Sequence, residues 1–316
     1  WETKHEAVRD ALLDERVEAL DGRGKGRTLG ARVVTFLVGG FINVTAVLFP
    51  KWNGAFSFNL LCRVKRVGLT ERGREFLAQG RSTNIDIDEY AAVLHSWGSG
   101  DKNVLFLHGW LSNSQRWAPY LSHFDLQEYT IYVLDAPGHG MAAGKYLNLE
   151  IYRKALIKSL GLIGEVDTLV CHSLGGLVGG YGFLHDRKLR IGRFVIMGAP
   201  SGMDAIFAYF EHRIGLSPKA LENLETKVNS VLQLPHEQIA ISRFFSEVDR
   251  PVLVVHDTGD RIAPFEPIRK ASDEVRHQGS ASERKNNELS TYFTQGENHS
   301  LQSANTVARV VQYIKE

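Results

Sequence analysis

The sequence predicts an α/β protein in which a mostly parallel sheet carries helices on both faces. Short apolar runs recur along the chain, each run ends in a distinctive loop, and stretches of helical periodicity lie between the runs. Strands that alternate with helices in this way form parallel sheets, and ligands bind at the carboxyl ends of such strands. The predicted strands are 104–107, 130–134, 169–170 and 194–197, and the predicted helices between them are 114–124, 148–161 and 174–186.

The main domain is expected to span residues 84–316. Residues 203–248 interrupt the alternation with apolar side chains at helical spacing, which indicates a helical cap inserted over the sheet. Residues 271–289 are charged and rich in turn formers, so we expect a solvated loop there. The other predicted elements are one or two early strands at 85–95, later strands at 251–255 and 290–293, and a last helix at 303–315.

Length and composition are those of an ordinary folded protein. The 316 residues are 43% hydrophobic and 23% charged, and the net charge of +1 argues against nucleic acid or an anionic membrane as a partner. Two cysteines, Cys62 and Cys171, imply no disulfide framework, and the twelve histidines include no His-Glu-x-x-His pair. We therefore expect neither a metal nor a cofactor.

Residues 1–83 are predicted to form a helical N-terminal extension outside the main domain. Residues 1–20 are charged with a helical pattern, and 21–27 alternate Gly with basic residues, which is typical of a flexible linker. A phosphate-binding loop is the alternative there, but no strand precedes it and no Gly-Lys-Ser/Thr follows. Residues 51–80 are predicted to be helical and of mixed polarity.

Residues 33–50 carry no formal charge and are close to the minimum length for a membrane-spanning helix. Polar or small residues recur at steps of three and four and would form one stripe on an otherwise apolar helix. This stripe favours packing of residues 28–50 on the main domain, and membrane association through the same residues is the alternative. The stripe consists of Arg32, Thr35, Gly39 and Asn43.

One turn in the sequence predicts a nucleophile. The apolar run 166–170 leads into residues 171–175 (Cys-His-Ser-Leu-Gly), and another apolar stretch follows, which indicates a strand, a sharp turn and a helix. Such a turn strains its middle residue and pushes that side chain outward, so Ser173 would be presented for reaction. The alternative is an ordinary strand-to-helix loop that contains a serine by chance.

A serine hydroxyl needs a base to take its proton, and the base needs an acid to orient it. The predicted strand 251–255 runs into a loop with two candidate acids, Asp257 and Asp260, and the strand 290–293 runs into a loop with His299. The chain order is then serine, acid, histidine, which is the order found in α/β hydrolases.

Together these loops make the sequence similar to the α/β-hydrolase family, over roughly residues 84–316. Besides the serine turn, which resembles the nucleophile elbow, residues 108–110 (His-Gly-Trp) resemble the oxyanion-hole loop. Residues 135–140 (Asp-Ala-Pro-Gly-His-Gly) resemble the loop after the fourth strand. Two positions depart from the family pattern: Cys171 stands where the elbow most often has glycine, and Asn298 stands where a glycine usually precedes the base.

The resemblance implies a role for each reacting group. Ser173 would attack a carbonyl carbon, His299 would take and return a proton, and Asp260 would fix the imidazole tautomer. Asp260 is preferred to Asp257 because its spacing to Pro264 fits the family pattern.

Backbone N–H groups of Trp110 and Leu174 would hold the oxyanion. We expect His172 to have a packing role, His108 and His139 to brace loops, and the Cys171 thiol to be buried.

The predicted activity is hydrolysis of a carboxylic ester through an acyl-enzyme, on a small, apolar substrate held under the 203–248 segment. Thioesterases, carbon–carbon bond hydrolases and acyltransferases of the same fold share these residues, and a non-catalytic binding module is the alternative of another class. We expect a cytoplasmic protein, although the chain begins at Trp1 and the lack of a leader sequence therefore carries no weight.

Overall fold

The computed structural model describes residues 29–279 and 288–316, and its centre is an eight-stranded sheet in the order β1-β2-β4-β3-β5-β6-β7-β8. Strand β2 pairs antiparallel with both of its neighbours, and the pairs from β4 to β8 are parallel, so the predicted mostly parallel sheet is confirmed. The strands are β1 Arg81–Ile87, β2 Tyr90–Gly98, β3 Lys102–Leu107, β4 Tyr129–Asp135, β5 Val166–His172, β6 Ile191–Met197, β7 Val252–Asp257 and β8 Leu289–Thr294.

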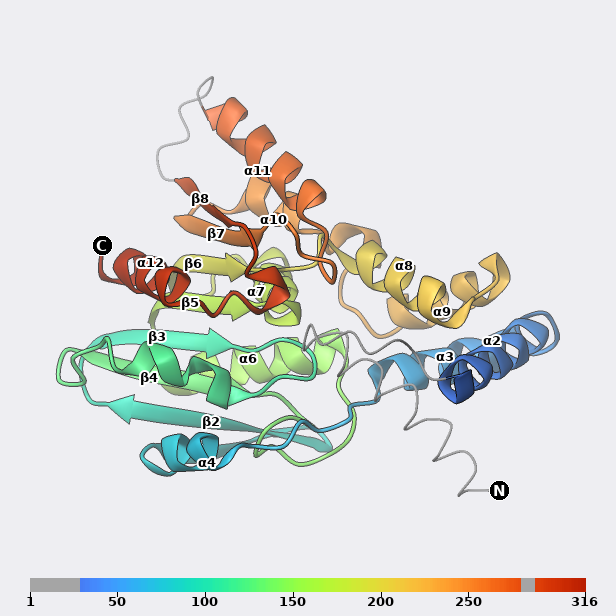
Figure 1. The fold of residues 1–316 in the computed structure, drawn as a ribbon, viewed down its shortest axis with the longest axis horizontal. Helices are drawn as coiled ribbons and strands as arrows, with labels where there is room; N and C mark the ends of the chain where they lie inside the picture. The colour runs from blue at the N-terminus through green and yellow to red at the C-terminus, as the bar shows by residue number, and fades with distance from the viewer. Residues whose placement is uncertain (1–28, 280–287) are drawn as a thin grey trace.

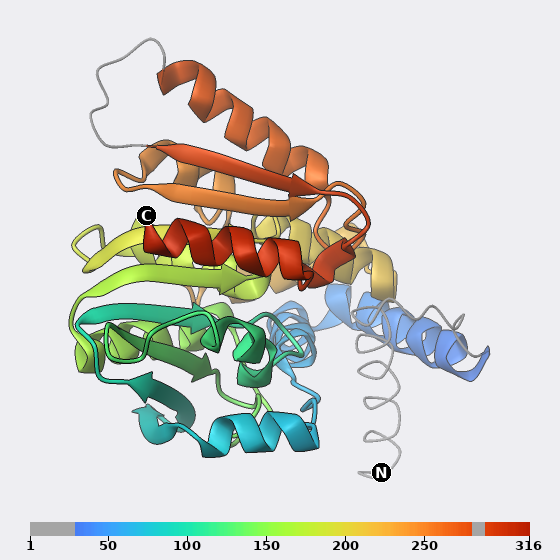
Figure 2. The ribbon, with the colours of Figure 1, turned by 60° about the vertical axis from the view of Figure 1, so that its left-hand side comes forward.

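Helices cover both faces of the sheet, as the alternation of elements predicts (Figures 1 and 2). Several begin at a side chain that accepts a hydrogen bond from the first turn: Asn148 caps α6, and Ser303 caps α12. The helices are α2 Leu29–Leu48, α3 Pro50–Cys62, α4 Glu71–Ala78, α5 Ala118–Leu121, α6 Leu149–Ile163, α7 Leu174–His185, α8 Met203–Ile214, α9 Pro218–Asn229, α10 Ile241–Glu247, α11 Phe265–Gly279 and α12 Ala304–Lys315.

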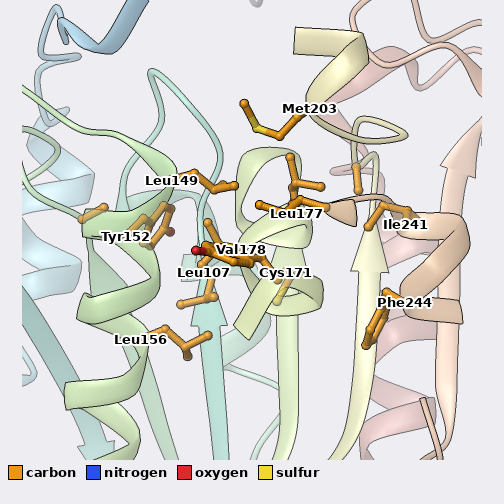
Figure 3. Packing of buried hydrophobic residues seen from close by; sticks show 14 of the residues in the cluster. Leu107, Leu149, Tyr152, Leu156, Cys171, Leu177, Val178, Met203, Ile241 and Phe244 are labelled. Atoms are coloured by element: carbon orange, nitrogen blue, oxygen red, sulfur yellow. The ribbon is translucent and has the colours of Figure 1, made fainter. Parts of the chain in front are cut away.

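The core lies in two layers, one on each side of the sheet, because successive side chains of a strand point to opposite faces. On β3, Leu105 and Leu107 belong to the layer beneath α6 and α7, whereas Val104 and Phe106 belong to the layer beneath α5 and α12. Figure 3 shows the first layer from close by, where side chains of α6 and α7 meet those of β3 and β5.

A helical cap lies beyond the carboxyl ends of the parallel strands, and α2, α3, α8 and α9 form it together (Figure 1). Three residues of the predicted stripe, Thr35, Gly39 and Asn43, lie on the packed side of α2. Thr35 is buried, a side chain at Gly39 would collide with the carbonyl oxygen of Ile214, and Asn43 donates to the carbonyl oxygen of Gly215 at 2.8 Å. These residues therefore pack inward on the cap helices α8 and α9, which lie within the predicted main domain.

Two elements differ from the sequence prediction. Helix α10 lies in the predicted insertion but packs against α7 and α11 beside the sheet, so the 203–248 segment only partly forms the cap. Residues 271–279 continue helix α11 instead of forming a loop. Its charged side chains pair along the helix, as in the Arg269–Asp273 pair, while Ala271 and Val275 are buried beneath them.

The first strand, β1, begins at Arg81, three residues before the predicted start of the main domain. Residues 51–80 contain α3, α4 and an extended link between them. The predicted helix at 1–20, the linker at 21–27 and residues 280–287 of the predicted loop lie outside the described residues. Within residues 29–279 and 288–316, no helix combines the length and the hydropathy of a membrane-spanning segment.

Candidate active site

Ser173 occupies a strained turn between β5 and α7. Its φ of 54° and ψ of −121° are sparsely populated by residues other than glycine, and its N–H donates to the carbonyl oxygen of Met197 at 2.8 Å. The helix that follows comes close to the neighbouring strand, because a Cβ at Gly175 would lie 2.8 Å from the carbonyl oxygen of Leu107. The geometry explains why the turn needs a small residue at that position.

Cys171 lies in strand β5 beneath the turn and away from its apex. The side chain is fully buried within the layer shown in Figure 3, and burial raises the pKa of its thiol well above the ordinary value. A cysteine is thus accommodated where the family most often has glycine, and its thiol is kept neutral and out of contact with solvent.

The structure brings Ser173, His299 and Asp260 together from the loops after three strands. The Ser173 hydroxyl lies 2.8 Å from Nε2 of His299, and Nδ1 of the same ring lies 2.8 Å from Oδ2 of Asp260. All three residues are buried, and less than about a tenth of the surface of each is exposed to solvent. An Nδ1–H that donates to the carboxylate leaves Nε2 free to accept the serine proton.

Asp260 is ionised in these surroundings. Burial alone would raise its pKa, but the hydrogen bond from His299 and the backbone N–H groups of Ile262 and Ala263 outweigh burial and lower the pKa. The carboxylate is therefore both fixed in position and charged opposite the imidazole.

The other candidate acid, Asp257, makes different contacts. Its carboxylate is fully buried and accepts hydrogen bonds from the Gly259 N–H at 2.9 Å, the Thr294 hydroxyl at 2.9 Å and the Glu297 N–H at 2.8 Å. These bonds connect the end of β7 to the end of β8. Asp257 therefore joins the two loops, while Asp260 contacts the histidine.

The loop that carries His299 contains the second departure from the family pattern. Asn298 has a φ of 55°, in the left-handed region that glycine adopts most easily and that asparagine tolerates better than most residues. The same loop is tied to α12, since Glu297 accepts from the hydroxyls of Ser303 and Thr306 at 2.7 Å each. Asn298 thus supplies the backbone shape that a glycine would supply.

His172 has a contact that the sequence does not reveal. Its Nε2–H donates to the backbone carbonyl oxygen of His299 at 2.8 Å, and the two rings lie 5.0 Å apart. Burial holds the pKa of His172 well below its ordinary value, so the ring is neutral. The neighbour of the serine in sequence thus supports the histidine in space, which goes beyond the packing role expected for it.

His108 and His139 join loops around the site, as predicted. Nε2 of His108 accepts from the Ala136 N–H at 3.1 Å, and Nε2 of His139 accepts from the Leu111 N–H at 3.2 Å. Burial lowers the pKa of both rings, that of His139 to about 3. These neutral rings hold the loop after β3, which contains Trp110, against the loop after β4.

A pocket opens at Ser173 beneath the cap. Trp110 and Leu174, the residues predicted to supply oxyanion donors, line it beside the serine and His299. Its other walls come from α3, α8, α9 and the loops after β4, β6 and β7, and they are mostly aliphatic and aromatic side chains. Among the described residues that line the pocket, none is Lys, Arg, Asp or Glu. No group of three or more metal-ligating side chains occurs in residues 29–279 and 288–316.

We expect the fold to lose stability in acid because four of its buried histidines resist protonation. Burial lowers the pKa of His108, His139, His172 and His256 below the ordinary value of 6.5, so the folded chain binds fewer protons than the unfolded chain below that pH. The free energy of unfolding should then fall with falling pH, by up to about 1.4 kcal/mol per pH unit for each histidine.

Urea unfolding between about pH 7 and about pH 4.5 checks this expectation. His139→Gln should flatten the dependence by about one proton, while His123→Gln, at an exposed histidine, should leave it unchanged. Equal slopes for the wild type and His139→Gln would show that His139 does not resist protonation.

The chain belongs to the alpha/beta hydrolase family, whose profile it matches over residues 104–283. The curated relatives include the 2-hydroxy-6-oxononadienedioate/2-hydroxy-6-oxononatrienedioate hydrolase of Escherichia coli, which is 30% identical over 121 residues. That match covers 35% of this chain and 40% of the relative, so the chain spans less than half of the curated relatives it matches.

Solved structures of the same fold include two esterases and a thioesterase domain. Esterase Pf2001 of Pyrococcus furiosus superposes with a TM-score of 0.57 at 18% identity, covering 80% of this chain and 96% of the other. Esterase RhEst1 of Rhodococcus sp. ECU1013 gives 0.52 at 18% identity, covering 75% and 99%. The thioesterase domain from the curacin biosynthetic pathway gives 0.52 at 15% identity, with the same coverage. These similarities establish the α/β-hydrolase fold.

Proposed function

We propose that this protein is a serine hydrolase that cleaves a carboxylic ester with an apolar acyl or alcohol group. The observation that carries the proposal is the hydrogen-bonded chain from Asp260 through His299 to Ser173, which ends at the floor of an apolar pocket. A serine in this arrangement is an activated nucleophile, and the same arrangement on a strained turn is what acyl transfer needs.

The reaction would proceed in two halves. Ser173 Oγ attacks the ester carbonyl carbon while His299 Nε2 takes its proton, and the imidazolium, stabilised by Asp260, then returns a proton to the leaving alcohol. Water repeats the sequence on the acyl-enzyme and releases the acid. No metal or cofactor enters either half.

Backbone N–H groups of Trp110 and Leu174 are the proposed donors to the developing oxyanion. Leu174 follows the nucleophile at the first position of α7, and Trp110 follows β3 on the loop that His108 and His139 brace. Losing one such donor costs about 3–4 kcal/mol of transition-state stabilisation. Both donors belong to the backbone. The neutral rings of His108 and His139 therefore contribute indirectly, because they fix the position of the loop that contains Trp110.

The pocket favours an ester over the substrate of the curated relatives. The name of those relatives specifies a dioate, which carries two carboxylates. The described residues that line this pocket include no cation to pair with a carboxylate, and a buried unpaired charge costs several kcal/mol. Carbon–carbon bond hydrolysis of a dioate is therefore the weaker candidate, while a thioester with an apolar acyl group would fit the same walls.

A matched pair of substrates tests the proposal. We expect turnover of p-nitrophenyl esters of short to medium fatty acids. The p-nitrophenyl monoester of a dicarboxylic acid of equal length should have a kcat/KM lower by at least about a hundredfold, because its free carboxylate would be desolvated. Thioesters of the same fatty acids complete the panel. Equal values for the charged and uncharged esters would mean that the acyl group does not enter this pocket, and no turnover above Ser173→Ala would end the ester proposal.

A further inference from the structure

Exposed apolar side chains gather on α2 and the start of α3. Figure 1 shows these helices at the far edge of the cap. Of the eleven large apolar side chains that are exposed among the described residues, nine lie in this stretch. We call them the outer face: Val33, Phe36, Leu37, Phe41, Val44, Val47, Leu48, Phe49 and Trp52. Apolar patches gathered in this way mark interaction sites on folded proteins.

The polarity of α2 is reversed with respect to an ordinary surface helix. Its small and polar stripe packs on the cap, where Asn43 also accepts from the Ser217 N–H at 2.7 Å. Its most exposed side chains are large and apolar, with Phe36 78% and Val47 72% exposed. An amphipathic helix normally turns its apolar side to the protein. Helix α2 instead turns its apolar side outward, where burial of these side chains would require an apolar partner.

The outer face is held in place by a buried polar network between three helices. Asn53 of α3 donates to the carbonyl oxygen of Ile42 at 2.7 Å, and Asn223 of α9 donates to the carbonyl oxygen of Ala46 at 3.0 Å. Asn223 also donates to Asn53 at 3.2 Å. Because these amides are buried and bonded, α2 keeps one orientation and presents the same side chains outward.

The segment of sequence that contains the outer face carries charge of one sign. Residues 22–70 contain no Asp or Glu, while the whole chain has a net charge of only +1. Exposed Lys51 lies beside Trp52, a combination typical of the interface between lipid and water. The basic residues of this stretch are Arg23, Lys25, Arg27, Arg32, Lys51, Arg63, Lys65 and Arg66.

We propose that the outer face docks on a lipid bilayer that carries anionic headgroups, with α2 lying along the surface. The apolar side chains would enter the region between headgroups and acyl chains, and the basic residues would attract the headgroups. A second copy of the chain fits less well, since a symmetric interface would bring the same excess of positive charge together from both copies.

Docking would also bring the bilayer to the wall of the pocket. Helices α3, α8 and α9, which contact α2, contribute side chains to the pocket lining, such as Phe58, Ile206 and Val228. An apolar ester could then pass from the membrane to Ser173 with little exposure to water. This second step rests on the proposed function, whereas the docking does not.

Co-sedimentation of the full chain with vesicles tests the docking. We expect binding to phosphatidylcholine vesicles that contain phosphatidylglycerol, and weaker binding to pure phosphatidylcholine or in high salt. The triple variant Phe36→Gln, Val44→Gln, Val47→Gln should lower the partition coefficient by at least about a hundredfold. Lys51→Glu should lower it by about tenfold.

Matched controls separate docking from folding and from catalysis. Leu162→Gln removes an exposed apolar side chain on α6 and should bind as the wild type does. Ser173→Ala should also bind normally, so a failed ester assay leaves this test intact. The outer-face variants and Leu162→Gln should melt at the wild-type temperature, because each replaces an exposed side chain.

Two results would overturn the proposal. One is a folded wild-type chain that does not bind the anionic vesicles, or a triple variant that binds them as strongly as the wild type. The other is a wild-type dimer in analytical ultracentrifugation that the triple variant converts to a monomer, without vesicle binding. That second result would assign the outer face to self-association.

Discussion

Replacement of Ser173 by alanine is expected to lower kcat/KM for p-nitrophenyl esters by about ten-thousand-fold to a million-fold. The hydroxyl is the group proposed to bond to the substrate carbonyl, and it lies 2.8 Å from the histidine nitrogen that would take its proton. Without it, only the pocket and the backbone donors remain to assist direct attack by water. Steady-state kinetics on purified Ser173→Ala and wild-type protein check the expectation.

Two controls make the loss specific to the hydroxyl. Cys171→Ala removes the buried thiol in the adjacent strand and should keep most of the activity, because that thiol is neutral and lies beneath the turn. Ser122→Ala removes an exposed hydroxyl and should have no effect. Wild-type rates in Ser173→Ala, or a comparable loss in Cys171→Ala, would mean that the nucleophile has been misassigned.

Asp260→Asn is expected to lower kcat by about ten-thousand-fold with little loss of folding. The amide would donate to Nδ1 of His299, where the carboxylate now accepts at 2.8 Å. The ring would then carry its proton on Nε2, which faces Ser173 and could no longer accept from the hydroxyl. The change therefore preserves the shape of the site and removes its ability to move the proton.

Asp257→Asn is the matched comparison, because Asp257 is the other buried carboxylate on the same loop. Its hydrogen bonds go to Gly259, Thr294 and Glu297 instead of His299, so the variant should melt at a lower temperature. The rate per folded molecule should stay within about tenfold of the wild type. A severe loss of rate in Asp257→Asn, with activity kept in Asp260→Asn, would exchange the two roles.

Local patterns in the sequence were sufficient for the parallel strands and for the loops that follow them. A strand and the loop that ends it can be predicted from residues that are neighbours in the sequence. Residues 171–175 likewise contain the small residues and the serine that the strained turn requires. The order of serine, acid and histidine could also be predicted. The 2.8 Å contacts between them depend on the sheet, which brings β5, β7 and β8 together.

Other features depend on contacts that are distant in sequence and were therefore missed. His172 supports the backbone of His299 across 127 positions in the chain, and no local pattern reports such a pair. The stripe on α2 was visible in the sequence and predicted packing on the main domain, but no local pattern identified α8 and α9 as its partners. Residues 271–279 were predicted to form a loop because many of them are charged. Their apolar side chains Ala271 and Val275, which are buried on one side of α11, were too few to indicate a helix.

Covalent labelling with a fluorophosphonate is the most direct test of whether Ser173 is an activated nucleophile. Such probes react with a serine hydroxyl only when a base has activated it. Intact-mass and peptide analysis should find a single adduct, on Ser173, that is absent from Ser173→Ala and forms far more slowly in Asp260→Asn. A folded wild-type chain that remains unlabelled, or an adduct on another residue, would contradict the proposed hydrolase and would favour a binding module with this fold.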